Sequence, residues 1–299
     1  MRILVSGSHG LVGKALIRSL TSDGHEIVRL VRDKPSGAAE VEWHPNEGRL
    51  DASALEGIDA VVHLAGESIA SGRWTNEKKR AILDSRVKGT ALLSNAIAQV
   101  SRPPSVFVSA SAIGYYGNRG DEVLTEKSAP GNDFLANVCV EWENATRLAI
   151  EKGIRTVHTR FGIILDANEG ALGKMLTPFQ MGVGGRVGSG KQWVSWISIE
   201  DVVNGLISVI GDKSVSGPVN FVAPNAVTNA EFTKVLGHVL SKPTLFPVPA
   251  FGVRMAFGEM ADALLLSSQR VKPVVLEERG FRFKWPTLEP ALRHLLARK

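Results

Sequence analysis

The chain of 299 residues has one cysteine, two tyrosines and no long hydrophobic run. The single Cys139 excludes an intramolecular disulfide and a metal site built from several cysteines, and it suits a reducing compartment. We expect no metal. No apolar run approaches the roughly 20 residues of a membrane-spanning helix. Met1 leads directly into a predicted strand, so we expect no signal peptide and a cytoplasmic protein.

Basic residues outnumber acidic ones, with a net charge of +5 and a sequence pI of about 9.4. Lys and Arg are spread along the chain without a long basic run. This pattern favours a mildly basic enzyme that binds an anionic cofactor over a nucleic-acid-binding protein. We expect a small-molecule substrate and neither nucleic acid nor a membrane as partner.

The first thirty-two residues have the pattern of a βαβ unit. Residues 3–5 form a short aliphatic strand, residues 14–22 an amphipathic helix and residues 26–31 a second strand. Glycines at a three-residue spacing fill the first turn, where a dinucleotide's pyrophosphate approaches the backbone and the helix N-terminus. The loop residues that we expect around the phosphates are Gly7, Ser8, His9, Gly10, Leu11, Val12 and Gly13.

The end of the second strand indicates which dinucleotide binds. NAD sites usually place an acidic residue there, on the ribose 2′-hydroxyl. Here Val31 is followed by Arg32, whose guanidinium suits a 2′-phosphate. NADP is therefore favoured over NAD. Two alternatives stay open: Arg32 is a solvated charge, or Asp33 serves NAD.

Further strands and helices alternate along the chain and predict an α/β fold, a Rossmann doubly wound parallel sheet with a smaller C-terminal substrate lobe. The strand over 57–64 ends at Leu64, Ala65 and Gly66, where the cofactor would pass. Arg86 lies in the helix predicted over 75–100 with Thr75 as N-cap, either as a cofactor contact or as a surface residue. Our domain boundaries are 1–165 for the Rossmann domain, with segments near 195–225 returning to it, and 166–299 for the substrate lobe, including a small C-terminal domain at about 243–299.

A hydroxyl cluster follows the strand over 105–109. Ser111, Tyr115 and Tyr116 lie where a substrate carbonyl could be held; the alternative is a turn with a packed aromatic pair. Arg160 lies in a strand over 154–165, near the same edge. Glycines over 185–191 resemble a phosphate loop, but Gln192 stands where Ser or Thr should bind magnesium, so we reject that reading. The other predicted elements are helices over 133–152 (capped by Asp133), 199–210, 229–240 (capped by Asn229), 251–266 and 286–297, and strands over 41–43 and 219–222.

These motifs together resemble the extended short-chain dehydrogenase/reductases, and most closely their atypical subgroup called epimerase family proteins. The similar segments are the glycine loop, HLAG at 63–66, SRVKGT at 85–90, DFLANVCVEWE at 133–143, GSGKQWVSWI at 188–197 and WPTLEPAL at 285–292. The resemblance implies an NADP-type Rossmann domain, and a homodimer by analogy. By position it implies cofactor contacts at Gly7, Gly10, Gly13, Val31, Arg32, Leu64, Ala65, Arg86 and Arg160.

One departure from the superfamily is large. Its catalysis depends on a Tyr-x-x-x-Lys pair, in which the lysine helps to lower the tyrosine's pKa. The matching positions here hold Leu135 and Cys139, and no Tyr-x-x-x-Lys occurs in the chain.

Two function hypotheses follow. In the first, the protein transfers hydride between NADP(H) and a carbonyl or alcohol, with Ser111 holding the substrate oxygen and Tyr116 or Tyr115 as a substitute acid. A tyrosine without a lysine helper would transfer its proton slowly at neutral pH. In the second, it binds the cofactor with little turnover, as a sensor or partner-binding scaffold.

Overall fold

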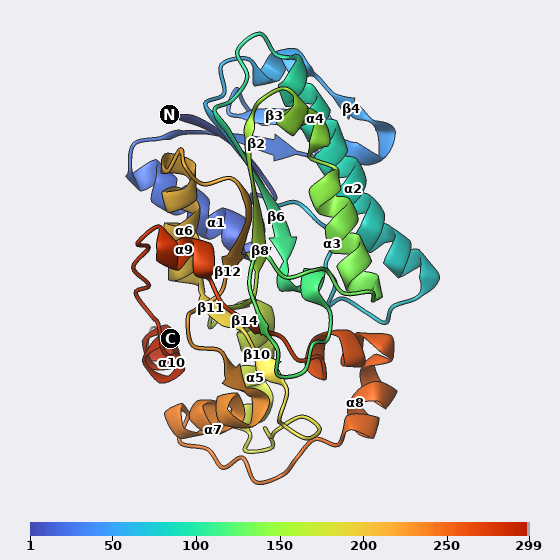
Figure 1. Ribbon diagram of the computed structural model, residues 1–299, viewed down its shortest axis with the longest axis vertical. Coiled ribbons are helices and arrows are strands. Elements are labelled where there is room, and N and C mark those ends of the chain that lie inside the picture. Colours follow the sequence, from blue (N-terminus) through green and yellow to red (C-terminus); the bar gives the residue numbers. More distant parts are fainter. Residues whose placement is uncertain (298–299) are drawn as a thin grey trace.

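The computed structural model describes residues 1–297, and an eight-stranded sheet forms its centre (Figure 1). Its strands are β1 (Arg2–Ser6), β2 (Glu26–Val31), β3 (Glu40–His44), β4 (Arg49–Leu50), β5 (Ala60–His63), β6 (Val106–Ala112), β8 (Arg155–Phe161) and β12 (Gly217–Phe221). Seven run parallel in the order β12-β8-β6-β5-β1-β2-β3, and β4 pairs antiparallel with β3 at the edge. This doubly wound order confirms the predicted α/β class and Rossmann type of sheet.

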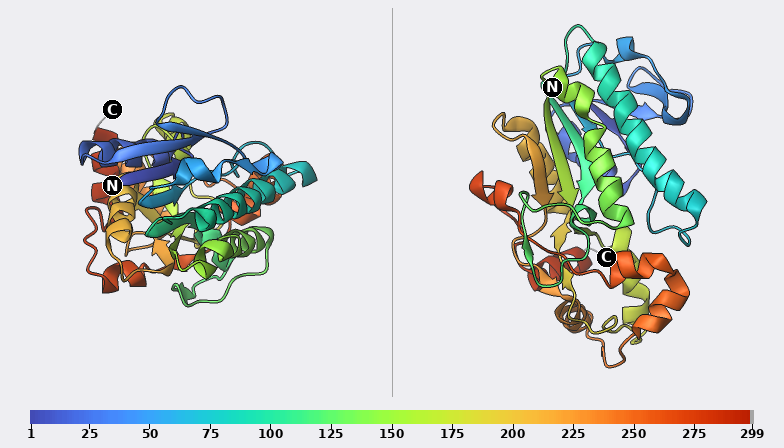
Figure 2. Two further views of the ribbon diagram at one scale, coloured as in Figure 1. Left: turned by 90° about the horizontal axis from the view of Figure 1, so that it is seen from above. Right: turned by 45° about the vertical axis from the view of Figure 1, so that its right-hand side comes forward.

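Helices cover both faces of the sheet (Figures 1 and 2). One face carries α2 (Asn76–Gln99), α3 (Phe134–Asn144) and α4 (Arg147–Glu151), and the other carries α1 (Leu11–Ser22), α6 (Ile199–Gly211) and α9 (Val274–Glu278). Two of the three predicted caps are confirmed, since Thr75 accepts a hydrogen bond from the Lys78 N–H and Asp133 accepts one from the Ala136 N–H. Among residues 1–297, none of the helices combines the length and apolar character that crossing a bilayer requires.

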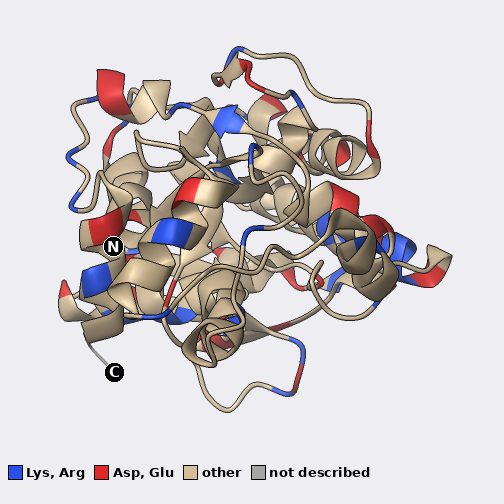
Figure 3. Cartoon of the chain, turned by 90° about the horizontal axis from the view of Figure 1, so that it is seen from below, with Lys and Arg blue, Asp and Glu red and all other residues tan. Residues whose placement is uncertain are grey.

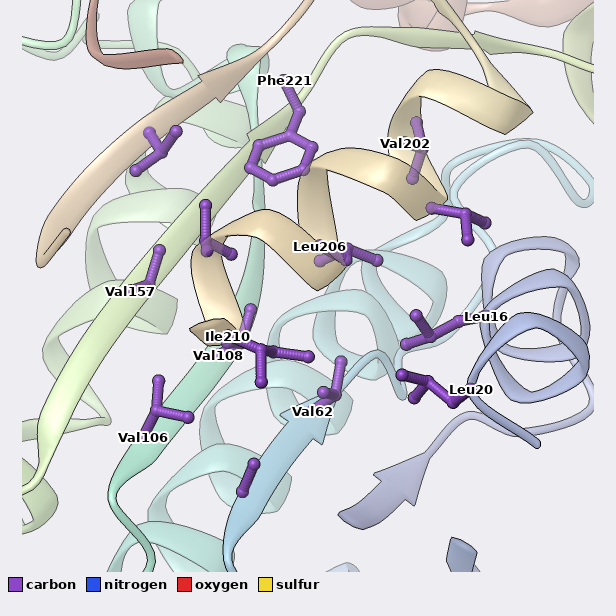
Figure 4. Close-up of a cluster of buried hydrophobic side chains, with 14 of the residues drawn as sticks. Leu16, Leu20, Val62, Val106, Val108, Val157, Val202, Leu206, Ile210 and Phe221 are labelled. Atoms are coloured by element: carbon purple, nitrogen blue, oxygen red, sulfur yellow. The ribbon is translucent and has the colours of Figure 1, made fainter. Parts of the chain in front are cut away.

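The strands at the centre of the sheet are continuous apolar runs because helices bury both of their faces. Ile3, Leu4 and Val5 of β1 are fully buried, as are Val61 and Val62 of β5. Figure 4 shows how side chains of α1 and α6 meet the strands on one face. The labelled members of this cluster are Leu16, Leu20, Val62, Val106, Val108, Val157, Val202, Leu206, Ile210 and Phe221.

The remaining elements gather mainly beyond the carboxyl ends of the parallel strands, at the lower end of Figure 1. They include β9 (Ile163–Leu165), α5 (Gly170–Gln180), β10 (Trp193–Val194), β11 (Trp196–Ser198), β13 (Val227–Thr228), α7 (Asn229–Val239), α8 (Ala250–Phe257), η4 (Ala261–Leu265) and α10 (Leu288–Ala297). Two short strands, β7 (Val123–Leu124) and β14 (Arg270–Val271), pair with each other. Short turns complete the chain at η1 (Pro45–Glu47), η2 (Ala52–Leu55) and η3 (Ile113–Tyr116).

Two predicted helices are each divided in the structure. The helix expected over 133–152 breaks between α3 and α4, where the Thr146 hydroxyl donates to the carbonyl of Glu143 at 2.7 Å and so competes with regular backbone bonding. The helix expected over 251–266 breaks at Gly258, which has a φ of +61° that few other residues adopt.

Two further details of the C-terminal lobe differ from the sequence prediction. The cap of α7 is Thr228, which accepts from the Glu231 N–H, while Asn229 instead accepts from the Val187 N–H. The helix α5 was absent from the predicted elements, because Gly173 and Pro178 in its interior weaken the helical pattern of the sequence.

Candidate functional site

The glycine loop between β1 and α1 is held by close contacts between backbones. Gly7 has a φ of +68°, and a Cβ at this position would lie 2.7 Å from the carbonyl carbon of Leu64. A Cβ on Gly13 would lie 2.3 Å from the carbonyl oxygen of Gly7. Such approaches leave no room for a side chain. The loop therefore needs glycine at both positions, as a dinucleotide loop does.

The other predicted loop residues divide between the core and the surface. Leu11 and Val12 pack their side chains against the core, which leaves their backbone N–H groups in the first turn of α1, where a helix has no internal acceptors. Ser8 is buried, and His9 and Gly10 are exposed. The helix N-terminus thus offers backbone donors to an anion.

The end of β2 lies beside this loop. Ser6 pairs with Leu30 in parallel register, so Val31 and Arg32 emerge at the same edge as Gly7. Val31 is buried and Arg32 is exposed. The structure thus brings the predicted 2′-phosphate contact to the loop's edge of the sheet.

A buried histidine network fixes the end of β5 against the glycine loop. The Ser6 hydroxyl oxygen accepts from the N–H groups of Leu64 at 3.1 Å and Ala65 at 3.3 Å, and it lies 2.6 Å from His63 Nδ1. Because both acceptor positions of that oxygen are used, its proton goes to Nδ1, and His63 Nε2–H donates to Thr90 Oγ1 at 3.0 Å. Burial lowers the pKa of His63 to about 4, so the ring is neutral near pH 7. The sequence interpretation missed this residue, although it begins the HLAG segment.

Arg86 reaches back from α2 to the end of β5. Its Nη1 donates to the carbonyl of Glu67 at 3.0 Å, and its guanidinium carbon lies 4.9 Å from the centre of the Trp142 ring. A Cβ on Gly66 would lie 3.3 Å from that same guanidinium carbon. The structure therefore brings Gly66 and Arg86 together at the edge where the cofactor is expected.

The hydroxyl cluster at the end of β6 meets a buried ion pair. Ser111 pairs in register with Arg160 of β8. Glu143 of α3 accepts two hydrogen bonds from Arg160, each of 2.8 Å, and one of 2.7 Å from the Ser111 hydroxyl. Ser111 and Arg160 are almost completely buried. Their polar groups are therefore engaged inside the protein, which does not fit the predicted roles of Ser111 as a substrate ligand and Arg160 as a cofactor contact.

The two tyrosines have different surroundings. Tyr116 is fully buried, its hydroxyl donates to Asn220 Oδ1 at 2.7 Å, and it accepts from Arg160 Nη1 at 3.0 Å. Burial raises the pKa of Tyr116 to about 12, so the prediction that it acts as the acid does not fit the structure. Tyr115 is partly exposed, and the centre of its ring lies 3.4 Å from the Arg160 guanidinium carbon. Of the two tyrosines, Tyr115 therefore remains the candidate for the substitute acid.

The helix face that should carry the Tyr-x-x-x-Lys pair points at η3. A Cβ on Gly114 would lie 3.4 Å from Cβ of Leu135 and 3.8 Å from Sγ of Cys139. Burial raises the pKa of the Cys139 thiol to about 12, so no thiolate acts there near neutral pH. Glu143 follows one turn later on the same face. The sequence interpretation missed its role, for which the four-residue spacing after Leu135 and Cys139 was the available signal.

Comparisons with known proteins agree with this geometry. Residues 3–222 match the model of the NAD dependent epimerase/dehydratase family, and residues 248–295 match a domain of unknown function, DUF1731. The chain therefore belongs to the NAD dependent epimerase/dehydratase family and has the fold of the short-chain dehydrogenase/reductases. Within that family, it is similar to the proteins named epimerase family protein, which confirms the resemblance drawn from the motifs.

Two relatives and one more distant structure show how far the similarity extends. An epimerase family protein of Mycobacterium tuberculosis is 43% identical over 296 residues, covering 99% of this chain and 98% of the relative. The crystal structure of the human epimerase family protein SDR39U1 with NADPH superposes with a TM-score of 0.92 at 35% identity, covering 99% of both chains. UDP-glucose 4-epimerase of Thermus thermophilus, in complex with NAD, has a TM-score of 0.77 over 99% of this chain and 98% of its own, but at 18% identity it supports the fold alone.

Proposed function

We propose that this protein binds NADPH at the glycine-loop edge and transfers its hydride to a small carbonyl, or, in the reverse direction, transfers hydride from an alcohol to NADP+. The observation that carries the cofactor assignment is the backbone cradle at Gly7 and Gly13, where only glycine fits. It is supported by the human relative of 35% identity that was crystallised with NADPH. The exposed Arg32 at the same edge suits the 2′-phosphate that distinguishes NADPH from NADH.

The cofactor would supply a hydride, and the protein must position the substrate and provide a proton. The ion pair of Arg160 with Glu143 is buried, and it serves as a platform for the Tyr115 ring stacked on the guanidinium. Tyr115 then stands at the carboxyl end of β6 as the proton donor, in place of the missing tyrosine on α3. Ser111 and Tyr116 hold this platform in place through their hydrogen bonds to Glu143 and Arg160.

Turnover tests this assignment. We would follow NADPH oxidation with a panel of small aldehydes and ketones, comparing Tyr115→Phe with Tyr116→Phe, which removes a hydroxyl of the platform but not the proposed proton donor and should therefore lower kcat less. Loss of a general acid should lower kcat by about 100-fold or more in Tyr115→Phe, with NADPH affinity unchanged. Undiminished turnover in Tyr115→Phe would show that Tyr115 is not the acid.

The second candidate function is an NADPH-binding protein with little or no turnover. Leu135 and Cys139 at the positions of the superfamily's catalytic pair favour it, because neither side chain can exchange a proton near neutral pH. NADPH binding without oxidation by any carbonyl of the panel would support this candidate over the enzyme.

A further inference from the structure

The far end of the C-terminal lobe holds an unusual distribution of charge. Residues 170–199 and 232–258 contain no Asp or Glu, but they contain six basic residues. These are Lys174, Arg186, Lys191, Lys234, Lys242 and Arg254, all of them exposed. The rest of the chain contains 29 basic and 30 acidic residues, which nearly balance. The positive excess of the molecule is therefore confined to these two segments.

The same two segments expose large apolar side chains. Leu245 is 78% exposed and Phe246 69%, and on α8 Phe251 is 69% and Met255 71% exposed; Met181, at the end of α5, is 72% exposed. Of the thirteen large hydrophobic side chains that are exposed in the described part of the chain, eight lie in these segments. A gathering of this kind on one surface marks an interaction site.

Backbone contacts join the two segments into one surface. The Val248 N–H donates to the carbonyl of Arg186 at 2.8 Å, and the Gly188 N–H donates to the carbonyl of Val248 at 2.9 Å. A Cβ on Gly185 would collide with the carbonyl oxygen of Phe246. We call residues 181–191 and 242–257 the tip surface. It forms one end of the molecule's longest axis (Figure 1), and Figure 3 views the molecule from that end.

We propose that the tip surface docks onto an anionic lipid bilayer. Aromatic and methionine side chains that protrude from the end of a long molecule can enter the boundary between headgroups and acyl chains, while Lys and Arg beside them attract anionic headgroups. A second copy of this chain is disfavoured as the occupant, because two such basic surfaces would repel each other. The proposal departs from the expectation of no membrane partner, which considered only spanning segments.

Nearby acidic groups cancel only part of this charge. Asp262 pairs with Arg254 of the tip surface, whereas Glu259 pairs with Lys79 of α2, outside the tip surface. The exposed Arg186, Lys191 and Lys242 keep the tip surface positive. Lys242 directly precedes the exposed apolar segment and is the best single position at which to reverse the charge.

Vesicle sedimentation of the full chain tests the proposal. The protein should sediment with vesicles of phosphatidylcholine and phosphatidylserine and not with phosphatidylcholine alone, and added salt should weaken the binding. Phe246→Ser combined with Phe251→Ser should abolish sedimentation, and Lys242→Glu should weaken it by about ten-fold or more. Circular dichroism and thermal unfolding would show that the variants stay folded, independently of cofactor binding.

Matched controls lie at the other end of the molecule. Ile150, 50% exposed on α4, and the exposed Lys152 allow Ile150→Ser and Lys152→Glu, which should sediment as the unmodified protein does. Three outcomes would overturn the proposal: no sedimentation with anionic vesicles, equal losses in the controls, or sedimentation that survives the double phenylalanine change. Tight binding to soluble polyglutamate in the last case would assign the surface to an acidic polypeptide instead.

Discussion

The glycine-loop edge and the β6–β8 edge lie at the same end of one sheet, but they are built from different groups. At the first edge, backbone meets backbone at Gly7 and Gly13, and donors are left for a ligand. At the second, Glu143, Arg160 and Tyr116 satisfy one another in a buried network. The same end of one sheet therefore carries an open backbone site beside a closed network of side chains, and the two can be changed separately by mutation.

The largest effect should come from adding a side chain to the glycine loop, where backbone atoms pack against each other. In Gly13→Ala the new Cβ would lie 2.3 Å from the carbonyl oxygen of Gly7, so the loop must move and NADPH binding should be lost. Fluorescence titration with NADPH measures this. Gly211→Ala is the matched control, because nothing lies within 4 Å of a Cβ there. Wild-type affinity in Gly13→Ala would contradict the assigned role of the loop.

Breaking the ion pair at the β6–β8 edge should lower the free energy of unfolding. Glu143→Leu leaves the Arg160 guanidinium buried without its carboxylate, which should cost about 3–5 kcal/mol of unfolding free energy. Urea denaturation measures the loss. The double change Glu143→Leu with Arg160→Met removes both charges and should recover much of it. A single variant as stable as the unmodified protein would show that the ion pair does not hold this edge together.

The histidine network behind the glycine loop should appear in the pH dependence of stability. The folded pKa of His63 is about 4, against an ordinary value of 6.5, so between these values the unfolded chain binds a proton that the folded chain does not. The unfolding free energy should therefore fall by about 3 kcal/mol as pH decreases from 6.5 to 4.

His63→Gln isolates this contribution, because it removes the titrating ring and keeps a donor for Thr90. The buried His158, whose pKa is also lowered by burial, acts in the same direction and remains in both proteins. Urea denaturation at several pH values should give a shallower slope in the variant. An unchanged slope would show that His63 does not titrate as described.

The smallest effect should follow from Tyr116→Phe. The change removes one hydroxyl that bonds to Asn220 and Arg160, so stability should fall by about 1–3 kcal/mol while NADPH affinity stays the same. Urea denaturation and NADPH titration of the same samples would separate the two quantities. A loss of NADPH affinity would show that Tyr116 also contributes to cofactor binding at the glycine-loop edge, and the two edges would then not be separate.

The strand, the glycine turn and the helix of the first edge could be predicted from the sequence because their signals are local. The β1 strand, the glycine spacing and the helix after it lie within twenty-two residues, and the caps at Thr75 and Asp133 depend on neighbours three positions away. The second edge depends on long-range packing. Arg160 at the end of a strand resembled a ligand contact, and only the approach of Glu143 from α3 shows that it is an internal partner.

Titration with NADPH and NADH, in the unmodified protein and in Arg32→Ala, tests the central claim most directly. We expect NADPH to bind more tightly than NADH. Arg32→Ala should remove this preference with little effect on NADH, because NADH lacks the 2′-phosphate that we assign to the guanidinium. If neither nucleotide binds the unmodified protein, the cradle at Gly7 and Gly13 is only a structural turn, and the proposed function fails with it.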